Sequence, residues 1–452
     1  MNCTIRIAAR LALTLAALAP AALAAQTPPS APSPADGLTL VVLQGERVLL
    51  DPAEGRIAPA TIVVEGDRIV QVLDGAPREL PADIAERMRH RHVFDAATLL
   101  MPGLIDSHVH LTGNPAPAFW AATVTTPERA TATGVANALK TAQAGFTTVR
   151  DLGAPGGASY ALRDAINAGE VPGPRVLAAG RMLSIVGGHG DLTGFRPQVI
   201  EALDGGNTCT GPVQCAEVVR KMSRAGADVI KFAATGGVLS QQNRGLDQHF
   251  TDEEMVAIVR TAHQLGLRVA AHAHGPRGVE AAARAGVDSI DHGTYVDEAG
   301  IRAMQASGSV LVPTLSPTIA YRENLPRGVY TRVVEAKIRQ RLEATGKNIA
   351  AARAAGLPIA FGTDAGVSEH GRNAEEMPLM VKYGGMSPQD VVVSATRTAA
   401  RSHPLRDDAR GGGADAEVGS PCRACTCSTP RPPCCWPTRC WRCTSPSSSS
   451  TW

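Results

Sequence analysis

Residues 103–111 read GLIDSHVHL, an apolar run that ends in two histidines separated by one residue. Successive side chains of a β-strand point to opposite faces, so a strand here places His108 and His110 on one face and Val109 on the other. Two neighbouring imidazoles on one face can hold a metal ion. Two polar residues where a strand leaves the core would give the same pattern, and the rest of the chain has to decide between these interpretations.

The same order of elements recurs along the chain after residue 101. A helical stretch ends at a glycine placed as a helix C-cap, a short apolar strand follows, and a polar residue closes it. The segments are QAGFTTVRD (143–151), RAGADVIKF (224–232), QLGLRVAAH (264–272), RAGVDSIDH (284–292), ASGSVLVPT (306–314) and AAGLPIAFGTD (354–364). With PRVLAAG (174–180) and the opening segment, they make eight strands that alternate with helices. This predicts an α/β fold with a parallel (β/α)8 barrel of TIM type, and favours it over an open doubly wound sheet.

Polar residues close several of these strands. In a barrel of this type the functional groups lie at the C-terminal ends of the strands, so these residues should converge on one mouth. They are His108 and His110 from the first strand, Lys231 from the fourth, His272 from the fifth, His292 from the sixth and Asp364 from the eighth. Imidazoles with a carboxylate suit a divalent transition metal such as zinc. Four histidines exceed what one catalytic zinc usually binds, so we expect a two-metal site.

Lys231 is the unusual member of this set. A bare ammonium would be repelled by two dications, because like charges repel at short range. A lysine carboxylated by CO2 would instead be an anionic bridge between the two ions. A strand-end lysine in a salt bridge is the alternative interpretation.

The segments GLIDSHVHL, GADVIKFAATGGV, RVAAHAHG, SIDHGTYVD and AFGTDAG together resemble the amidohydrolase superfamily. The similarity is to its imidazolonepropionase-like branch of exported Xaa-Pro dipeptidases, carboxypeptidase-like enzymes and ochratoxin-cleaving amidases, and it covers residues 38–400. It implies a binuclear centre bridged by carboxylated Lys231, with His108, His110 and Asp364 on one ion and His272 and His292 on the other. It also implies that a bridging hydroxide attacks the scissile carbonyl, while Asp364 takes the water proton and passes it to the leaving amine.

Three further residues are predicted to bind substrate. In HAHG, His272 matches the family's ligand, and His274, nearer the rim, is expected to contact substrate or to be structural. His189 lies in the glycine-rich segment VGGHGD, where the backbone can approach a ligand closely, and the family loop resembles it. Tyr295 follows a ligand strand and could donate a hydrogen bond to a substrate carboxylate, or simply pack. Arg150 and His370 are weaker candidates.

These features predict metal-dependent hydrolysis of amide (carbon–nitrogen, peptide-type) bonds in small substrates such as dipeptides or N-acyl amino acids. The alternatives are a hydrolase of cyclic amides or lactones with the same site, and an inactive barrel that binds metal or ligand. The net charge of +2 over 452 residues, with no basic stripe, gives no reason to expect a nucleic-acid partner.

The N-terminal residues 1–25 are predicted to be a secretory signal, with Arg6 and Arg10 before a short apolar stretch and AALAA at the cleavage site. The apolar stretch is shorter than the ~20 residues of a spanning helix. We therefore expect a periplasmic or secreted protein with no membrane attachment after cleavage, and a disordered spacer at 26–37. In an oxidising compartment Cys209 and Cys215, in CTGPVQC, either form a local disulfide or stay two thiols.

The rest of the chain is predicted to form two domains and a C-terminal tail. Residues 38–100 contain short β-branched runs (LTLVVL, ERVLL, TIVVEG and RIVQVL) and should form the N-terminal part of a small β-sandwich domain. Residues 101–402 should form the barrel. Residues 403–452 change abruptly to cysteine, proline, arginine and serine without apolar periodicity. This favours a reading-frame shift over a cysteine-rich metal-binding tail, and predicts a disordered tail and an incomplete β-domain.

Overall fold

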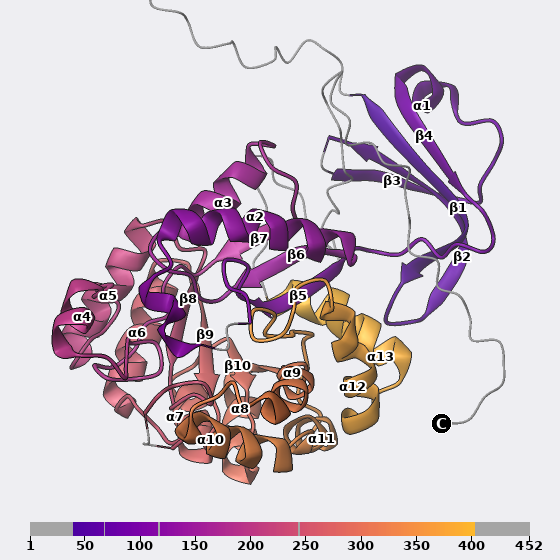
Figure 1. The fold of residues 1–452 in the computed structure, drawn as a ribbon. Helices are drawn as coiled ribbons and strands as arrows, with labels where there is room; N and C mark the ends of the chain where they lie inside the picture. The colour runs from indigo at the N-terminus through magenta and orange to yellow at the C-terminus, as the bar shows by residue number, and fades with distance from the viewer. Residues whose placement is uncertain (1–38, 67, 116–117, 243–244, 403–452) are drawn as a thin grey trace, which may run out of the picture.

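The structure is a computed structural model that describes residues 39–402, apart from 67, 116–117 and 243–244 (Figure 1). The predicted signal, spacer and aberrant tail therefore lie outside the described residues. Figure 1 shows a small sheet beside a larger body in which helices surround a set of strands. Within the described ranges, no helix is both long enough and apolar enough to cross a bilayer.

The small domain contains one four-stranded sheet in the order β3-β2-β1-β4. Its elements are β1 (Leu40–Asp51), β2 (Arg56–Glu65), β3 (Arg68–Asp74), α1 (Ala82–Arg87) and β4 (Met88–Phe94). β1 runs antiparallel to β2 and parallel to β4. The runs LTLVVL and ERVLL, expected as two strands, form the single strand β1, whose pairing with β2 is irregular between Gly45 and Val48. Gly45 and Val48 are each paired with β2, so β1 runs through the irregularity as one strand.

One part of this sheet has little cover. Leu40, Val42, Val63 and Ile84 pack into a small core. In contrast to these four, the sheet's side chains Ile57, Ile69, Val70, Val72 and Val93 are exposed to solvent. The described residues therefore bury only part of the sheet's apolar surface.

Seven parallel strands and one irregular segment form the barrel. The strands are β5 (Leu104–Val109), β6 (Phe146–Asp151), β7 (Arg175–Ala178), β8 (Val229–Ala233), β9 (Arg268–Ala273), β10 (Ser289–His292) and β11 (Val310–Val312). They form two sheets, β5-β6-β7 and β8-β9-β10-β11. Residues 358–365 take the eighth position: Ile359 pairs with Leu311, and Ala365 pairs with Val109.

Backbone hydrogen bonds close the gaps between these sheets. The amide of Asp228, just before β8, donates to the carbonyl of Ala178 on β7 over 2.9 Å, and Leu183 bonds to Lys231 over 2.8 Å. On the opposite side, the amide of Asp364 donates to the carbonyl of His108 over 2.7 Å. The predicted (β/α)8 barrel is thus confirmed, with an eighth position too irregular to form a regular strand.

The main helices cover the outside of the barrel (Figure 1). They are α2 (Pro127–Gln143), α3 (Ala158–Asn167), α5 (Pro212–Arg224), α6 (Asp252–Gln264), α7 (Pro276–Arg284), α8 (Glu298–Ser307), α9 (Pro317–Asn324), α10 (Arg332–Glu343), α11 (Lys347–Ala354) and α12 (Glu376–Gly384), with short helices α4 (Pro197–Ala202), α13 (Pro388–Val393) and α14 (Ala399–Ser402). Gly145 and Gly226, two of the predicted cap glycines, follow α2 and α5 with φ of 92° and 100°. Side chains larger than hydrogen are strained at such angles, which is why these helices end there.

The barrel strands separate two kinds of side chain. On β8, Ile230 and Phe232 are fully buried in the main apolar cluster beneath the helices. Lys231, between them, is also buried but faces the polar interior of the barrel. This alternation places polar residues at the barrel's mouth without opening the apolar layer.

Cys209 and Cys215 form a disulfide, with their Cα atoms 5.0 Å apart. Both cysteines are buried, and α5 begins between them at Pro212. Of the two alternatives left open by the sequence, the structure has the local disulfide. It fixes the start of α5 to the segment that precedes it.

Replacing both cysteines, as Cys209→Ala with Cys215→Ala, should lower the free energy of unfolding by about 2 kcal/mol, because the closed loop is short and constrains the unfolded chain only modestly. Thermal unfolding of the parent and the double variant measures the difference. A reducing agent should lower the parent's melting temperature and leave the variant's unchanged. Equal melting temperatures without reductant would contradict the prediction.

Candidate metal centre

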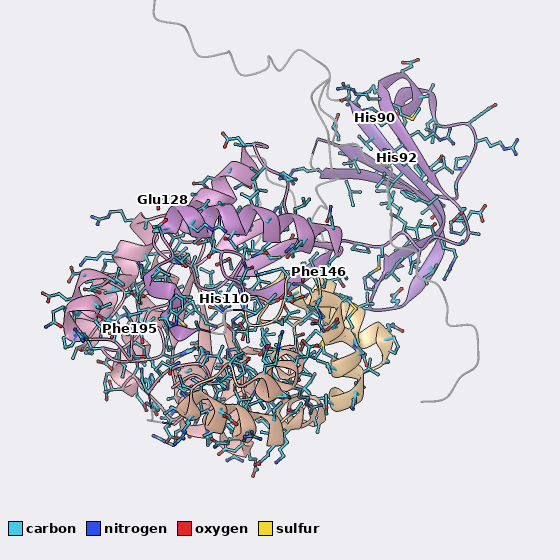
Figure 2. All side chains as sticks on the ribbon, viewed as in Figure 1. His90, His92, His110, Glu128, Phe146 and Phe195 are labelled. Atoms are coloured by element: carbon cyan, nitrogen blue, oxygen red, sulfur yellow. A yellow bond between two sulfur atoms is a disulfide. The ribbon has the colours of Figure 1, made fainter. Side chains whose placement is uncertain are left out.

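A cavity of about 250 Å³ opens at the C-terminal ends of the barrel strands. All six predicted metal ligands line it, namely His108, His110, Lys231, His272, His292 and Asp364. They come from β5, β8, β9, β10 and the eighth position. His110 lies within the barrel in Figure 2, well away from the exposed His90 and His92 of the small sheet. The convergence expected from the strand pattern therefore occurs.

The first group of donors surrounds Asp364. His108, His292 and Asp364 offer ligand atoms that all lie within 4.8 Å of one another. Oδ1 of Asp364 lies 3.3 Å from Nε2 of His110 and 3.5 Å from Nε2 of His108. These two imidazole nitrogens and one carboxylate oxygen can be satisfied together by a single cation.

The second group consists of three imidazoles. Ligand nitrogens of His272, His274 and His292 lie within 4.8 Å of one another. Nδ1 of His274 is hydrogen-bonded to the hydroxyl of Thr294 over 2.7 Å, and Nδ1 of His292 to that of Thr314 over 2.7 Å. Such outer bonds fix ring orientation and leave Nε2 for a ligand. His274, predicted to contact substrate or to be structural, is thus a further candidate ligand.

Burial holds five of the six histidines that line the cavity neutral. Burial lowers the pKa of His108 to about 4 and of His189 to about 3, and it lowers the pKa values of His272, His274 and His292 well below the usual 6.5. Burial also opposes charge on His110, but the hydrogen bond to Asp364 outweighs it and raises that pKa. Neutral imidazole is the form that binds a metal, so the histidines other than His110 can bind divalent ions without first losing a proton.

A buried charge cluster lies beneath these histidines. Nζ of Lys231 contacts Oδ2 of Asp291, and Nη2 of Arg150 lies 3.1 Å from Oδ1 of the same carboxylate. Nδ1 of His108 lies 3.4 Å from Oδ2. Burial opposes ionisation of Asp291, yet Lys231 and Arg150 hold its pKa well below the ordinary range. Burial itself lowers the pKa of Lys231, and Asp291 acts against that.

Sequence reasoning missed Asp291, because it precedes the ligand His292 and should face the opposite way on a strand. His292 has a φ of 73°, in the left-handed region. This breaks the strand alternation, so both side chains reach the interior of the barrel. Thr314 and Asp364, at the ends of the next two barrel positions, also have positive φ (45° and 58°), and no other non-glycine residue of the described chain does. Strain of this kind concentrates at functional sites.

The predicted substrate contacts lie in different places. His189 lines the cavity, its Nδ1 2.5 Å from Oγ of Ser240 and its ring 4.3 Å from that of His272. His274 also lines it. Tyr295 is not among the lining residues: it packs against the apolar cluster beside α10, and its buried hydroxyl has no hydrogen-bond partner within the described ranges.

The two weaker candidates stand apart from the cavity surface. The fully buried Arg150 supports Asp291 and donates from Nε to the carbonyl of Ser107 over 2.7 Å. His370 contacts the carbonyl of Gly113 through Nε2 over 3.0 Å. Neither residue is among those that line the cavity.

Helix α10 brings residues that the sequence analysis did not single out. Nζ of Lys337, one turn before Arg341, donates to the carbonyls of Gly237, Ser240 and Gln242 over 2.8, 2.7 and 3.2 Å. These bonds hold a loop whose Val238 and Leu239 line the cavity. Arg341 lines the cavity itself. A helix with this many charges resembles a solvated helix, so its sequence carries no signal for this role.

The chain is similar to several known proteins. The amidohydrolase family model matches residues 99–409. Ochratoxinase from Aspergillus niger is 30% identical over 366 residues, which cover 78% of this chain and 74% of that protein. Among solved structures, a Xaa-Pro dipeptidase with methionine bound in its active site is 31% identical with a TM-score of 0.73, covering 82% of this chain and 90% of that one. A prolidase in complex with N-methylphosphonate-L-proline is 29% identical, with a TM-score of 0.71 and coverages of 82% and 88%.

With the barrel fold, these similarities define a hydrolase of carbon–nitrogen bonds. The chain belongs to the amidohydrolase family.

Glu376, at the start of α12, supports the segment after β11. It is fully buried and accepts hydrogen bonds from the amides of Leu315 and Ser316 and from the Ser316 hydroxyl, over 2.8, 2.6 and 2.6 Å. The neighbouring Thr314 and Pro317 line the cavity. Burial raises the pKa of Glu376 to about 7.

Glu376→Leu should lower the free energy of unfolding by at least ~3 kcal/mol, because it leaves three buried donors without an acceptor. Glu376→Gln keeps an acceptor and should be milder. Since the folded pKa lies above the unfolded one, the parent should lose stability relative to Glu376→Gln as pH rises from 4.5 through about 7. Denaturant titrations across pH measure this difference, and a pH-independent difference would contradict it.

Proposed function

We propose that the protein hydrolyses amide bonds in small substrates, such as dipeptides or N-acyl amino acids, with two divalent ions of zinc type. The observation that carries the proposal is the set of imidazoles, most of them held neutral by burial, with one lysine and one carboxylate around one buried cavity. The family and the two dipeptidase-like neighbours support the bond type.

The ligands divide into two sets. His108, His110 and Asp364 would hold one ion, and His272 and His292 the other, with Lys231 between them as a CO2-derived carbamate. Two bound divalent ions would lower the pKa of a water molecule and polarise the amide carbonyl. Modification would remove the positive charge of Lys231, and Arg150 would then remain to balance Asp291.

Asp364 would move the protons. Burial opposes its charge, but the adjoining His108, His110 and Lys231 keep its pKa below the ordinary value, so it is ionised at neutral pH. It can therefore accept a proton from the attacking water. The protonated carboxyl would then give that proton to the leaving amine nitrogen, which is the usual general base and general acid sequence.

The cavity would select small substrates. Its volume of about 250 Å³ and its apolar wall of Met182, Val238, Leu239 and Val367 suit one amino-acid side chain better than a long peptide. His189 and His274 would contact the substrate near the scissile bond. Methionine and a proline derivative are bound by two structural neighbours, which fits this size.

We also propose that the protein acts in the periplasm or is secreted. The disulfide between Cys209 and Cys215 supports this location, because such bonds persist in oxidising compartments.

Metal analysis tests the centre. Purified protein supplied with zinc and bicarbonate should hold about two ions per chain, and Lys231→Ala should lose most of them, because the anionic bridge is gone. Lys221→Ala, at an exposed lysine of α5, is the matched control and should keep both ions. A folded parent that binds no metal would overturn the proposal and favour an inactive barrel.

Turnover tests the reaction. Asp364→Asn should lower kcat on a cleaved dipeptide by about 10²- to 10⁴-fold, because it removes the proton carrier. A panel of dipeptides and N-acyl amino acids, assayed beside cyclic amides and lactones, measures the bond preference. Cleavage of the cyclic substrates alone would contradict the proposed substrate class.

A further inference from the structure

The cavity contains a buried cation without a counter-ion. Arg341, on α10, is only 3% exposed, yet its Nη1 has no hydrogen-bond partner among the described residues. None of the carboxylates in the described ranges lies within the 4.0 Å of an ion pair. A buried guanidinium stays charged, and leaving such a charge unpaired is unfavourable. The absence of a partner therefore indicates a position where an external anion completes the site.

The surroundings of Arg341 separate it from the metal ligands. It lines the same cavity as Tyr321, Pro317 and Val367, which form apolar surface beside the imidazole cluster. The charge on Arg341 acts on the hydroxyls of Tyr295 and Tyr321, both of which have raised pKa values because of burial. Apart from Lys231 in the metal centre, Arg341 is the only cationic side chain, histidines aside, among the described residues that line the cavity.

Contacts of the neighbouring residues fix the helix that carries Arg341. Lys337, on the same face of α10, is fixed by its three carbonyl contacts, and Val334 and Ile338 are buried in the adjoining apolar cluster. A guanidinium on a fixed helix can present its planar donors to a carboxylate without a rearrangement of the backbone.

We propose that Arg341 binds a carboxylate of the amino acid released from the substrate, and so restricts the enzyme to substrates that carry this anion. The inference rests on the proposed amide hydrolysis, and it identifies Arg341 as the residue that binds the amino acid released by that reaction. The carboxylate has two possible sources, the α-carboxylate and an acidic side chain.

Steady-state kinetics on Arg341→Met tests the proposal. For a cleaved N-acyl amino acid, KM should rise about 10- to 100-fold with kcat within about threefold, since one charge-assisted contact to the substrate is lost. Arg341→Lys should restore part of the loss. Arg339→Met, on the exposed face of the same helix, removes the same charge and should keep the parent's KM. An unchanged KM in Arg341→Met would overturn the proposal.

Matched substrates identify the anion. If the α-carboxylate is bound, the C-terminal amide of the same substrate should be cleaved equally poorly by parent and Arg341→Met. If a side-chain acid is bound, the penalty should appear for C-terminal Asp or Glu and vanish for Asn or Gln. A penalty that is the same for every substrate, charged or amidated, would contradict a role in anion binding.

Stability and binding separate this proposal from the reaction itself. Arg341→Met should melt at or above the parent's temperature, because it removes an unpaired buried charge. A clear fall would show a structural role and overturn the inference. Should the parent cleave no amide, calorimetry of metal-loaded protein with L-glutamate and L-glutaminamide still tests the anchor: binding of glutamate that is lost in Arg341→Met supports it, and equal binding of glutamate by parent and variant refutes it.

Discussion

The hydrogen bonds that join residues 107–110 to 361–365 hold the rest of the site in place. Asp364 donates its amide to the carbonyl of His108, and His110 donates to the carbonyl of Ala365, both over 2.7 Å. They bring the first barrel strand against the last position of the ring, so that ligands more than two hundred residues apart become neighbours. Asp364 has a left-handed backbone at this join, a conformation that only the surrounding contacts can maintain. The geometry of the donor set therefore depends on closure of the barrel rather than on any local loop.

Charge balance beneath the cavity is the second requirement. Asp291 is fully buried and has two cationic partners, Arg150 and Lys231. One partner would be enough to compensate a single carboxylate, so the second is available for other chemistry. Arg150 also donates to the carbonyl of Ser107, next to the first histidine ligand. The same buried guanidinium thus links the charge cluster to the strand that carries His108.

Much of the fold could be predicted from the sequence because its signals are local. A glycine after each helix and an apolar run after each glycine identify the barrel strands, and the rule that functional groups lie at strand ends gathers the ligands. Asp291 escaped this reasoning because the left-handed His292 breaks the alternation on which it relies. Lys337 escaped it because it contacts a loop about a hundred residues earlier in the chain. No pattern within α10 reveals that the face carrying Lys337 and Arg341 is buried. The placement of Tyr295 outside the cavity lining likewise depends on how α10 packs.

The three carbonyl contacts of Lys337 have a mechanical consequence. They connect α10 to the loop at 237–242, whose Ser240 contacts His189 at the cavity wall. Arg341 lies one turn further along the same helix, so the wall and the guanidinium form a single unit. Lys337 contacts the carbonyls of Gly237 and Gln242 at either end of this loop, so the position of the wall is set by the position of the helix. One helix therefore carries both the residue that positions the cavity wall and the guanidinium that faces the cavity, one turn apart.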